Sequence, residues 1–121
     1  MKGFLSVIRS FGPACAGLWW ALKTQRNLRV HAAATAIVVP LGLGLKITLG
    51  EWLVVILSVG MVWAAELIDT AIETLADRVS MEREEPIRRV KDVAAAAVLV
   101  AAVSAAIAGV IIFAPRLWRL F

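Results

Sequence analysis

The sequence predicts an all-α membrane protein, in which an N-terminal amphipathic helix lies on the membrane surface and three transmembrane helices follow it. Hydrophobic residues make up 61% of the 121 residues, and the mean hydropathy is +0.85, which is too apolar for an ordinary soluble domain. Three apolar stretches follow the N-terminal segment and are long enough, or nearly so, to cross a bilayer. The Lys and Arg residues gather between these stretches, as is typical of membrane proteins. Residues 1–121 are therefore interpreted as one membrane domain.

Residues 1–27 are predicted to form the surface helix and a connector. Arg9 and Lys23 interrupt the apolar side chains, so the segment is too polar to span the membrane but can lie along its surface. A kink is expected at Gly12–Pro13, because proline removes a helix hydrogen bond. No signal peptide is expected, because the first apolar run stops at Arg9. The five Trp residues are expected in the interfacial belts, and His31 is interpreted as an interfacial or packed side chain.

The rest of the chain divides into a first span, a second helix, a charged loop and a third span: residues 28–48, 51–80, 81–92 and 93–114, respectively. A tight turn is predicted at Gly50–Glu51, between the first span and the second helix. The third span is rich in alanine, which allows close helix approach. It is expected to end at Pro115, because proline disrupts helices.

The distribution of Lys and Arg predicts the orientation of the chain in the membrane. Five of these residues lie before residue 30 and five lie between residues 78 and 91, whereas one lies near the first loop, at residue 46, and two lie in the C-terminal tail. Because basic residues are retained on the cytoplasmic side, the N-terminus and the second loop are predicted to be cytoplasmic. The second helix is longer than the hydrocarbon core, so its end is expected to extend into the cytoplasmic layer.

Four carboxylates form a ridge along the second half of this helix: Glu66, Asp69, Glu73 and Asp77. Their spacings of three, four and four residues place them on one helix face. Glu66 is expected roughly two turns inside the membrane, and Glu73 at its interface. Four neighbouring carboxylates repel one another, so a cation such as a metal ion, Lys or Arg is expected against this acidic ridge.

Carboxylates and basic residues that meet at a lipid interface suit phosphoryl transfer to a lipid hydroxyl. One carboxylate can take the hydroxyl proton, others can hold Mg²⁺ on a nucleotide, and Lys or Arg can neutralise the phosphates. The alternative is a small oligomeric transporter that uses Glu66 as a proton or cation site. A transporter would need polar groups through the outer half of the membrane, where residues 52–65 supply only Ser58.

Three segments resemble the signature segments of the prokaryotic diacylglycerol kinase family, which includes the undecaprenol kinases. They read ALKTQRNLRVH over residues 21–31, AELIDTAIETLADRVS over 65–80 and KDVAAAAVLV over 91–100. In the second segment the family pattern is close to E-x-x-N-[ST]-A-x-E-x-x-x-D, which this chain matches except at Asp69. The first and third segments look more like the undecaprenol kinase branch.

The resemblance implies a lipid kinase of the bacterial inner membrane that works as a homotrimer with active sites shared between subunits. It implies MgATP as the phosphate donor and undecaprenol or diacylglycerol as the acceptor. Glu66 becomes the general base for the lipid hydroxyl, and Glu73 becomes a Mg²⁺ ligand. The implied nucleotide contacts lie in the second loop and at the start of the third span: Glu82, Arg83, Glu84, Lys91 and Asp92.

Two positions depart from the family pattern. The family usually has a Glu at the position of Gln25, which belongs to its metal- and nucleotide-binding site, and an Asn at the position of Asp69. The number of carboxylates is therefore unchanged, and Asp69 lies one helix turn from Glu73. We expect Asp69 to serve as a metal ligand in the active site, in place of the acidic ligand that is missing at the neutral Gln25. The competing interpretation is a family member with altered or weak activity and a regulatory role.

Overall fold

The structure, a computed structural model, describes residues 2–80, 82 and 84–121. These residues form four α-helices and no strand: α1 (Lys2–Thr24), α2 (Arg26–Leu45), α3 (Leu49–Val79) and α4 (Glu85–Leu120). The predicted all-helical fold is therefore confirmed. By length and composition α2, α3 and α4 are each long and apolar enough to cross a membrane, in agreement with the number of predicted spans. The homotrimer and the position of α1 on the membrane surface stay predictions.

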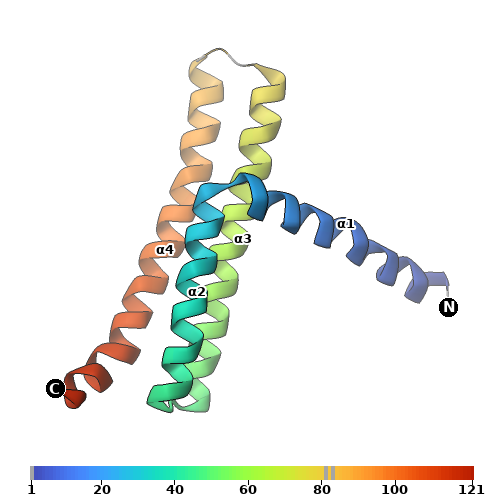
Figure 1. The fold of residues 1–121 in the computed structure, drawn as a ribbon. Helices are drawn as coiled ribbons and strands as arrows, with labels where there is room; N and C mark the ends of the chain where they lie inside the picture. Colours follow the sequence, from blue (N-terminus) through green and yellow to red (C-terminus); the bar gives the residue numbers. More distant parts are fainter. Residues whose placement is uncertain (1, 81, 83) are drawn as a thin grey trace.

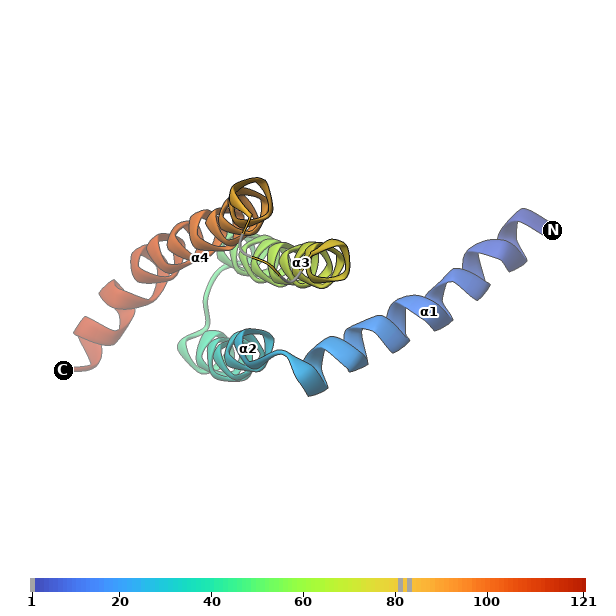
Figure 2. The same ribbon diagram turned by 90° about the horizontal axis from the view of Figure 1, so that it is seen from above.

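The helices α2, α3 and α4 lie side by side as a bundle, and α1 projects away from them (Figure 1). The helices α3 and α4 run antiparallel and make the most extensive contact. Both extend past the junction of α1 and α2, so one end of the bundle consists of α3 and α4 alone (Figure 1). Figure 2 shows α1 leaving the bundle on the side opposite the C-terminal end of α4. Pro13 does not break α1, and Ala21 is the buried residue of this helix.

The junction between α1 and α2 is the single residue Gln25, whose extended backbone (φ −105°, ψ 113°) turns the chain. The Nη1 of Arg29 donates hydrogen bonds to the carbonyl oxygens of Lys23 (2.7 Å) and Leu22 (3.4 Å). These bonds satisfy two of the last carbonyl groups of α1, which have no partner within their own helix. Because of this junction α2 begins at Arg26, two residues before the predicted start of the first span.

The C-terminal end of α2 is closed by a Schellman motif. Lys46 has a left-handed backbone (φ 54°, ψ 53°), and its N–H donates to the carbonyl oxygen of Leu43 at 3.4 Å. The N–H of Ile47 donates to the carbonyl oxygen of Gly42 at 3.2 Å, and the Ile47 side chain is buried. The motif ends α2 at Leu45, three residues before the predicted end of the first span.

A capping box starts α3 directly after this motif. The N–H of Glu51 donates to the Thr48 hydroxyl at 3.2 Å, and the N–H of Thr48 donates to the Glu51 carboxylate at 2.9 Å. The predicted tight turn at Gly50–Glu51 is therefore wrong, because both residues lie in the first turn of α3. The chain turns over residues 46–48 instead, where the left-handed residue ends one helix and the capping box begins the next.

The helix α4 is longer than the predicted third span. The charged loop predicted over residues 81–92 is wrong in its second half, because α4 begins at Glu85. Pro86 lies in the first turn, where a missing N–H costs no helix hydrogen bond. The helix also continues through Pro115 to Leu120, contrary to the prediction that this proline ends it. In a membrane the remaining backbone groups have no water to bond, so keeping the helix on both sides of a proline is favourable.

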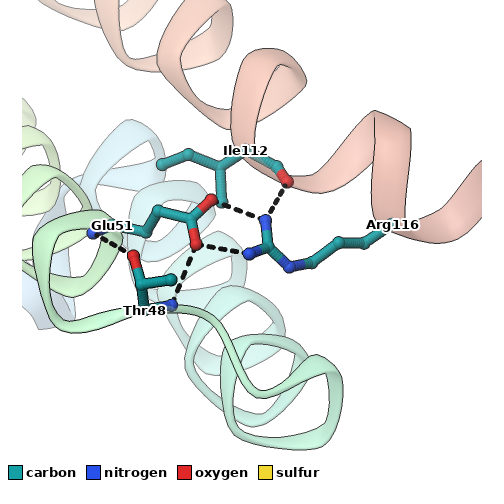
Figure 3. Close-up of polar contacts among 4 residues, drawn as sticks. All are labelled: Thr48, Glu51, Ile112 and Arg116. Atoms are coloured by element: carbon teal, nitrogen blue, oxygen red, sulfur yellow. Dashed lines mark hydrogen bonds and ion pairs between the residues drawn. The ribbon is translucent and has the colours of Figure 1, made fainter.

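The core of the bundle lies near the α2–α3 turn. Four buried apolar residues form a cluster there: Ile47, Val55, Ile112 and Phe113. At the same end Arg116 of α4 makes two hydrogen bonds of 2.5 Å to the Glu51 carboxylate and one of 3.0 Å to the carbonyl oxygen of Ile112 (Figure 3). This network fastens the C-terminal part of α4 to the start of α3. Most other large apolar side chains are exposed, as expected for surfaces that face lipid.

Candidate active site

The acidic ridge of α3 runs from the interior of the bundle to its exposed end. Glu66 and Asp69 are buried, with 2% and 7% of their surface exposed. Glu73 is half-buried, and Asp77 is exposed. The ridge therefore holds both a carboxylate shielded from solvent and a carboxylate that a soluble molecule can reach.

The Glu66 carboxylate faces the first turns of α2. Its Oε2 lies 3.7 Å from the Nε2 of His31, and the side chain of Asn27 also lies close to the carboxylate. Among the described residues Oε2 has no hydrogen-bond partner. A buried carboxylate oxygen without a partner is costly, so this atom is available to a substrate group or to a donor that moves closer.

Asp69 is the second buried carboxylate with a free oxygen, because its Oδ1 also lacks a hydrogen-bond partner in the described part of the chain. Its negative charge lies close enough to repel those of Glu66 and Glu73. No group of three His, Cys, Asp or Glu side chains among the described residues is arranged to hold a metal ion. Mg²⁺ commonly uses only one or two carboxylates, with water and phosphate oxygens as its other ligands. Asp69 and Glu73 fit that smaller requirement.

Lys91 of α4 brings a positive charge to the exposed end of the ridge. Its ammonium group donates a hydrogen bond to Asp77 of α3. Its positive charge also attracts the Glu73 carboxylate. Among the other predicted nucleotide contacts Asp92, Glu82 and Glu84 are exposed. Arg83 lies outside the described residues. The structure thus brings Lys91 to the acidic ridge.

Gln25 lies at the α1–α2 junction, where its side-chain amide donates a hydrogen bond of 3.4 Å to the Thr24 hydroxyl. The side chain of Gln25 is half-buried. Two residues further along the chain lies Asn27, whose side chain is near Glu66. The start of α2 is therefore the segment that approaches the buried part of the ridge.

A cavity of about 300 Å³ lies between α2, α3 and α4. Most of its wall is apolar, and its polar residues are His31, Thr35, Ser58 and Trp63. The Trp63 indole N–H donates a hydrogen bond of 3.0 Å to the Thr35 hydroxyl. Trp63, which the sequence assigns to an interfacial belt, thus forms a polar contact between two helices.

The sequence interpretation missed a row of polar residues on one face of α2. Asn27, His31 and Thr35 follow one another at four-residue intervals in α2, whose other polar side chains are Arg26 and Arg29. Two of them lie beside Glu66, and the third accepts the bond from Trp63. The spacing was visible in the sequence as a helical period, but nothing in it showed which helix this row would face.

Comparisons with known proteins place the chain in a family. A sequence model of the prokaryotic diacylglycerol kinase family matches residues 12–113. The undecaprenol kinase of Bacillus subtilis is 37% identical over 109 residues, which cover 90% of this chain and 89% of the relative. The diacylglycerol kinase of Haemophilus influenzae is 35% identical over 82% of this chain and 84% of its own length, and that of Escherichia coli is 31% identical over 87% and 86%. The chain therefore belongs to the prokaryotic diacylglycerol kinase family, whose members are ATP-dependent lipid kinases.

Proposed function

We propose that the protein transfers the γ-phosphate of MgATP to the hydroxyl group of a membrane lipid, either undecaprenol or diacylglycerol. The observation that carries this proposal is the acidic ridge of α3, which joins the buried Glu66 to Glu73 and the nearby Lys91. A lipid hydroxyl can approach from the membrane and a nucleotide from the solvent. Names of relatives support both acceptors, because they include an undecaprenol kinase and diacylglycerol kinases.

Glu66 acts as the general base in this proposal. Its carboxylate takes the proton of the lipid hydroxyl while the hydroxyl oxygen forms a bond to the γ-phosphorus. The bond between the γ-phosphorus and the bridging oxygen breaks, and ADP leaves with that oxygen. The free oxygen of the buried carboxylate supports this role, since no described side chain occupies it.

The nucleotide site is proposed around Glu73 and Lys91. Glu73 and Asp69 would hold Mg²⁺, which neutralises phosphate charge when it is bound. Lys91 contacts the phosphates, with Asp92, Glu82, Arg83 and Glu84 around the nucleotide. Gln25 would approach the same metal as a neutral side chain, and Asp69 supplies the missing charge. The free Oδ1 of Asp69 supports this assignment.

We also propose that the protein works as a homotrimer in the bacterial inner membrane, with its N-terminus in the cytoplasm. The orientation is supported by the excess of Lys and Arg before α2 and between α3 and α4. The trimer is supported by α1, whose exposed apolar residues include Phe4, Phe11 and Trp19. A neighbouring subunit or the membrane surface would cover them.

The neutral Gln25 favours one other candidate function: a family member that binds MgATP but turns over weakly and has a regulatory role. Both candidates predict nucleotide binding, and they differ in transfer of phosphate to lipid.

Transfer from radiolabelled ATP to undecaprenol and to diacylglycerol, measured side by side in mixed micelles, tests the proposal. Glu66→Gln is expected to lose transfer, whereas Glu85→Gln, which removes an exposed carboxylate paired with Arg89, is expected to keep it. Transfer by Glu66→Gln at the wild-type rate would show that Glu66 is not the base. Absence of transfer by a folded wild-type protein that binds MgATP would favour the regulatory role.

A further inference from the structure

His31 lies between the Glu66 carboxylate and the cavity. Its Nε2 is 3.7 Å from Glu66 Oε2, and its side chain also lines the cavity wall. The His31 side chain is 20% exposed and that of Glu66 only 3%. Among the described residues that line the cavity, His31 alone has a side chain that can carry a charge.

A pair of hydrogen bonds holds this part of α2 in place. The Thr35 hydroxyl donates to the carbonyl oxygen of His31 at 2.8 Å and accepts from the Trp63 indole at 3.0 Å. Thr35 lies one turn after His31 on α2, and Trp63 lies one turn before Glu66 on α3. The two helices are therefore joined by a polar contact directly beside the His31–Glu66 pair, which fixes how they face each other at that level.

The carboxylate itself is less constrained than the helices that carry it. Glu66 Oε2 is buried and has no hydrogen-bond partner in the described part of the chain. At 3.7 Å, His31 Nε2 is too far for a hydrogen bond. Hydrogen bonds within catalytic groups are often long without substrate and tighten in the substrate complex. A shift of less than 1 Å would bring this pair to hydrogen-bond distance.

We propose that His31 is a positioning residue that holds the Glu66 carboxylate for its reaction with the lipid hydroxyl. The N–H at Nε2 donates to one oxygen of the carboxylate, and the other oxygen accepts the hydroxyl proton. The contact between Thr35 and Trp63 keeps His31 opposite Glu66. This inference rests on the proposed role of Glu66 as the base.

Three substitutions of His31 separate the role of a hydrogen-bond donor from that of packing. Glutamine carries an amide N–H at a similar reach, asparagine carries the same amide on a shorter side chain, and leucine is apolar. A misplaced base costs up to about 10²-fold in rate, so His31→Leu and His31→Asn are expected to lower kcat by about 10- to 100-fold. His31→Gln is expected to keep at least about a third of the wild-type kcat.

The readout that a purely structural role would not produce is a change in kcat without a change in KM for MgATP. The KM for MgATP of all three variants is expected to stay within about twofold of wild type. Trp63→Phe, which removes the indole donor, should lower kcat by about two- to fivefold. Trp52→Phe is the matched control on α3 and should leave kcat unchanged. Equal kcat values for His31→Gln and His31→Asn would overturn the proposal, and so would a normal kcat for His31→Leu.

Glu66→Gln, assayed in parallel, separates a failure of this inference from a failure of the proposed function. If Glu66→Gln is inactive and the His31 variants are fully active, His31 has no positioning role and Glu66 is still the base. If Glu66→Gln is active, the proposed base is wrong and the role of His31 falls with it. If His31→Leu fails to assemble, the kcat values of His31→Gln and His31→Asn still test the positioning role, because both variants keep a polar side chain at this position.

Discussion

The ammonium group of Lys91 donates a hydrogen bond to Asp77, which joins the start of α4 to the end of α3. At the opposite end of the same two helices Arg116 is paired with Glu51. The two ion pairs are about 26 residues apart along α3 and about 25 along α4, which corresponds to roughly 39 Å of helix. This exceeds the hydrocarbon core of about 30 Å, so the two pairs are far enough apart to lie on opposite sides of it. Together they set the antiparallel register of α3 against α4.

Replacing Asp77 by asparagine should weaken nucleotide binding, if Lys91 contacts the phosphates. Without the carboxylate, the Lys91 ammonium loses the partner that aims it, and the KM for MgATP should rise about three- to tenfold. The kcat should change little, since Asp77 is not placed at the reacting atoms. Steady-state kinetics with Glu85→Gln as the control would measure this. An unchanged KM in Asp77→Asn, together with a raised KM in Lys91→Ala, would show that Lys91 acts independently of Asp77.

Asp69→Asn should raise the Mg²⁺ concentration that gives half-maximal activity, because it removes one of the two proposed metal ligands. We expect an increase of about tenfold or more, the size found when a group that supports a metal site is removed. Adding Gln25→Glu to this variant returns a carboxylate to the family's usual position. The Mg²⁺ concentration at half-maximal activity should then fall part of the way back to the wild-type value. A Mg²⁺ titration of the three proteins would measure both effects. An unchanged Mg²⁺ dependence in Asp69→Asn would exclude its proposed role.

Gly42→Ala should destabilise the protein. A Cβ added at Gly42 would lie 2.8 Å from Cη2 and 3.0 Å from Cζ2 of Trp52, which is too close for carbon atoms. Overpacking of this kind costs about 1–3 kcal/mol. Unfolding in mixed micelles with increasing SDS would measure the loss. Gly44→Ala is the matched control on the same helix, because a Cβ there meets nothing within 4 Å, and it should be neutral or stabilising.

Lys46→Gly should stabilise the turn between α2 and α3. Lys46 has a positive φ of 54°, which costs a residue with a side chain about 1–2 kcal/mol. Glycine avoids that cost but makes the unfolded chain more flexible by about 0.4–1 kcal/mol. The net gain should be about 0.5–1 kcal/mol in the same unfolding experiment. Lys46→Ala keeps the backbone cost and should show no gain; equal stabilities of the two variants would contradict this explanation.

Glu51→Gln should lower the thermal stability in detergent. The substitution removes the charge that pairs with Arg116 and leaves one acceptor oxygen in place of the two that Arg116 contacts, and it weakens the capping box with Thr48. The reference is Glu85→Gln, which breaks an exposed pair with Arg89, and such pairs contribute little to stability. A Tm measurement on both variants should show the larger decrease for Glu51→Gln. A decrease no larger than that of Glu85→Gln would mean that the network in Figure 3 does not stabilise the bundle.

The sequence by itself determined the helical class, the three apolar spans and the acidic ridge. Each of these depends on hydropathy or on a spacing within one helix, so neighbouring residues are enough to define it. The four carboxylates lie along α3 from buried Glu66 to exposed Asp77, in the order that their spacing predicted. The family resemblance was carried by contiguous segments, and the match over residues 12–113 confirms it.

The ends of the helices were less predictable. The sequence predicts a loop over residues 81–92 and a helix end at Pro115, yet Pro86 lies in the first turn of α4 and Pro115 lies inside it. The turn before α3 was placed at Gly50–Glu51 from composition, but it is set by the left-handed Lys46 and the capping box of Thr48. These details depend on individual hydrogen bonds at the helix ends, to which residue preferences are only a weak guide.

Only the tertiary structure decided which side chains of different helices meet. Nothing within α2 shows that His31 lies opposite Glu66, or that Thr35 accepts a hydrogen bond from Trp63. The pairing of Lys91 with Asp77 and of Arg116 with Glu51 is likewise a property of two helices together. The physical reason is that the period of a helix is local, whereas the rotation and register of one helix against another depend on packing and polar contacts along both of them.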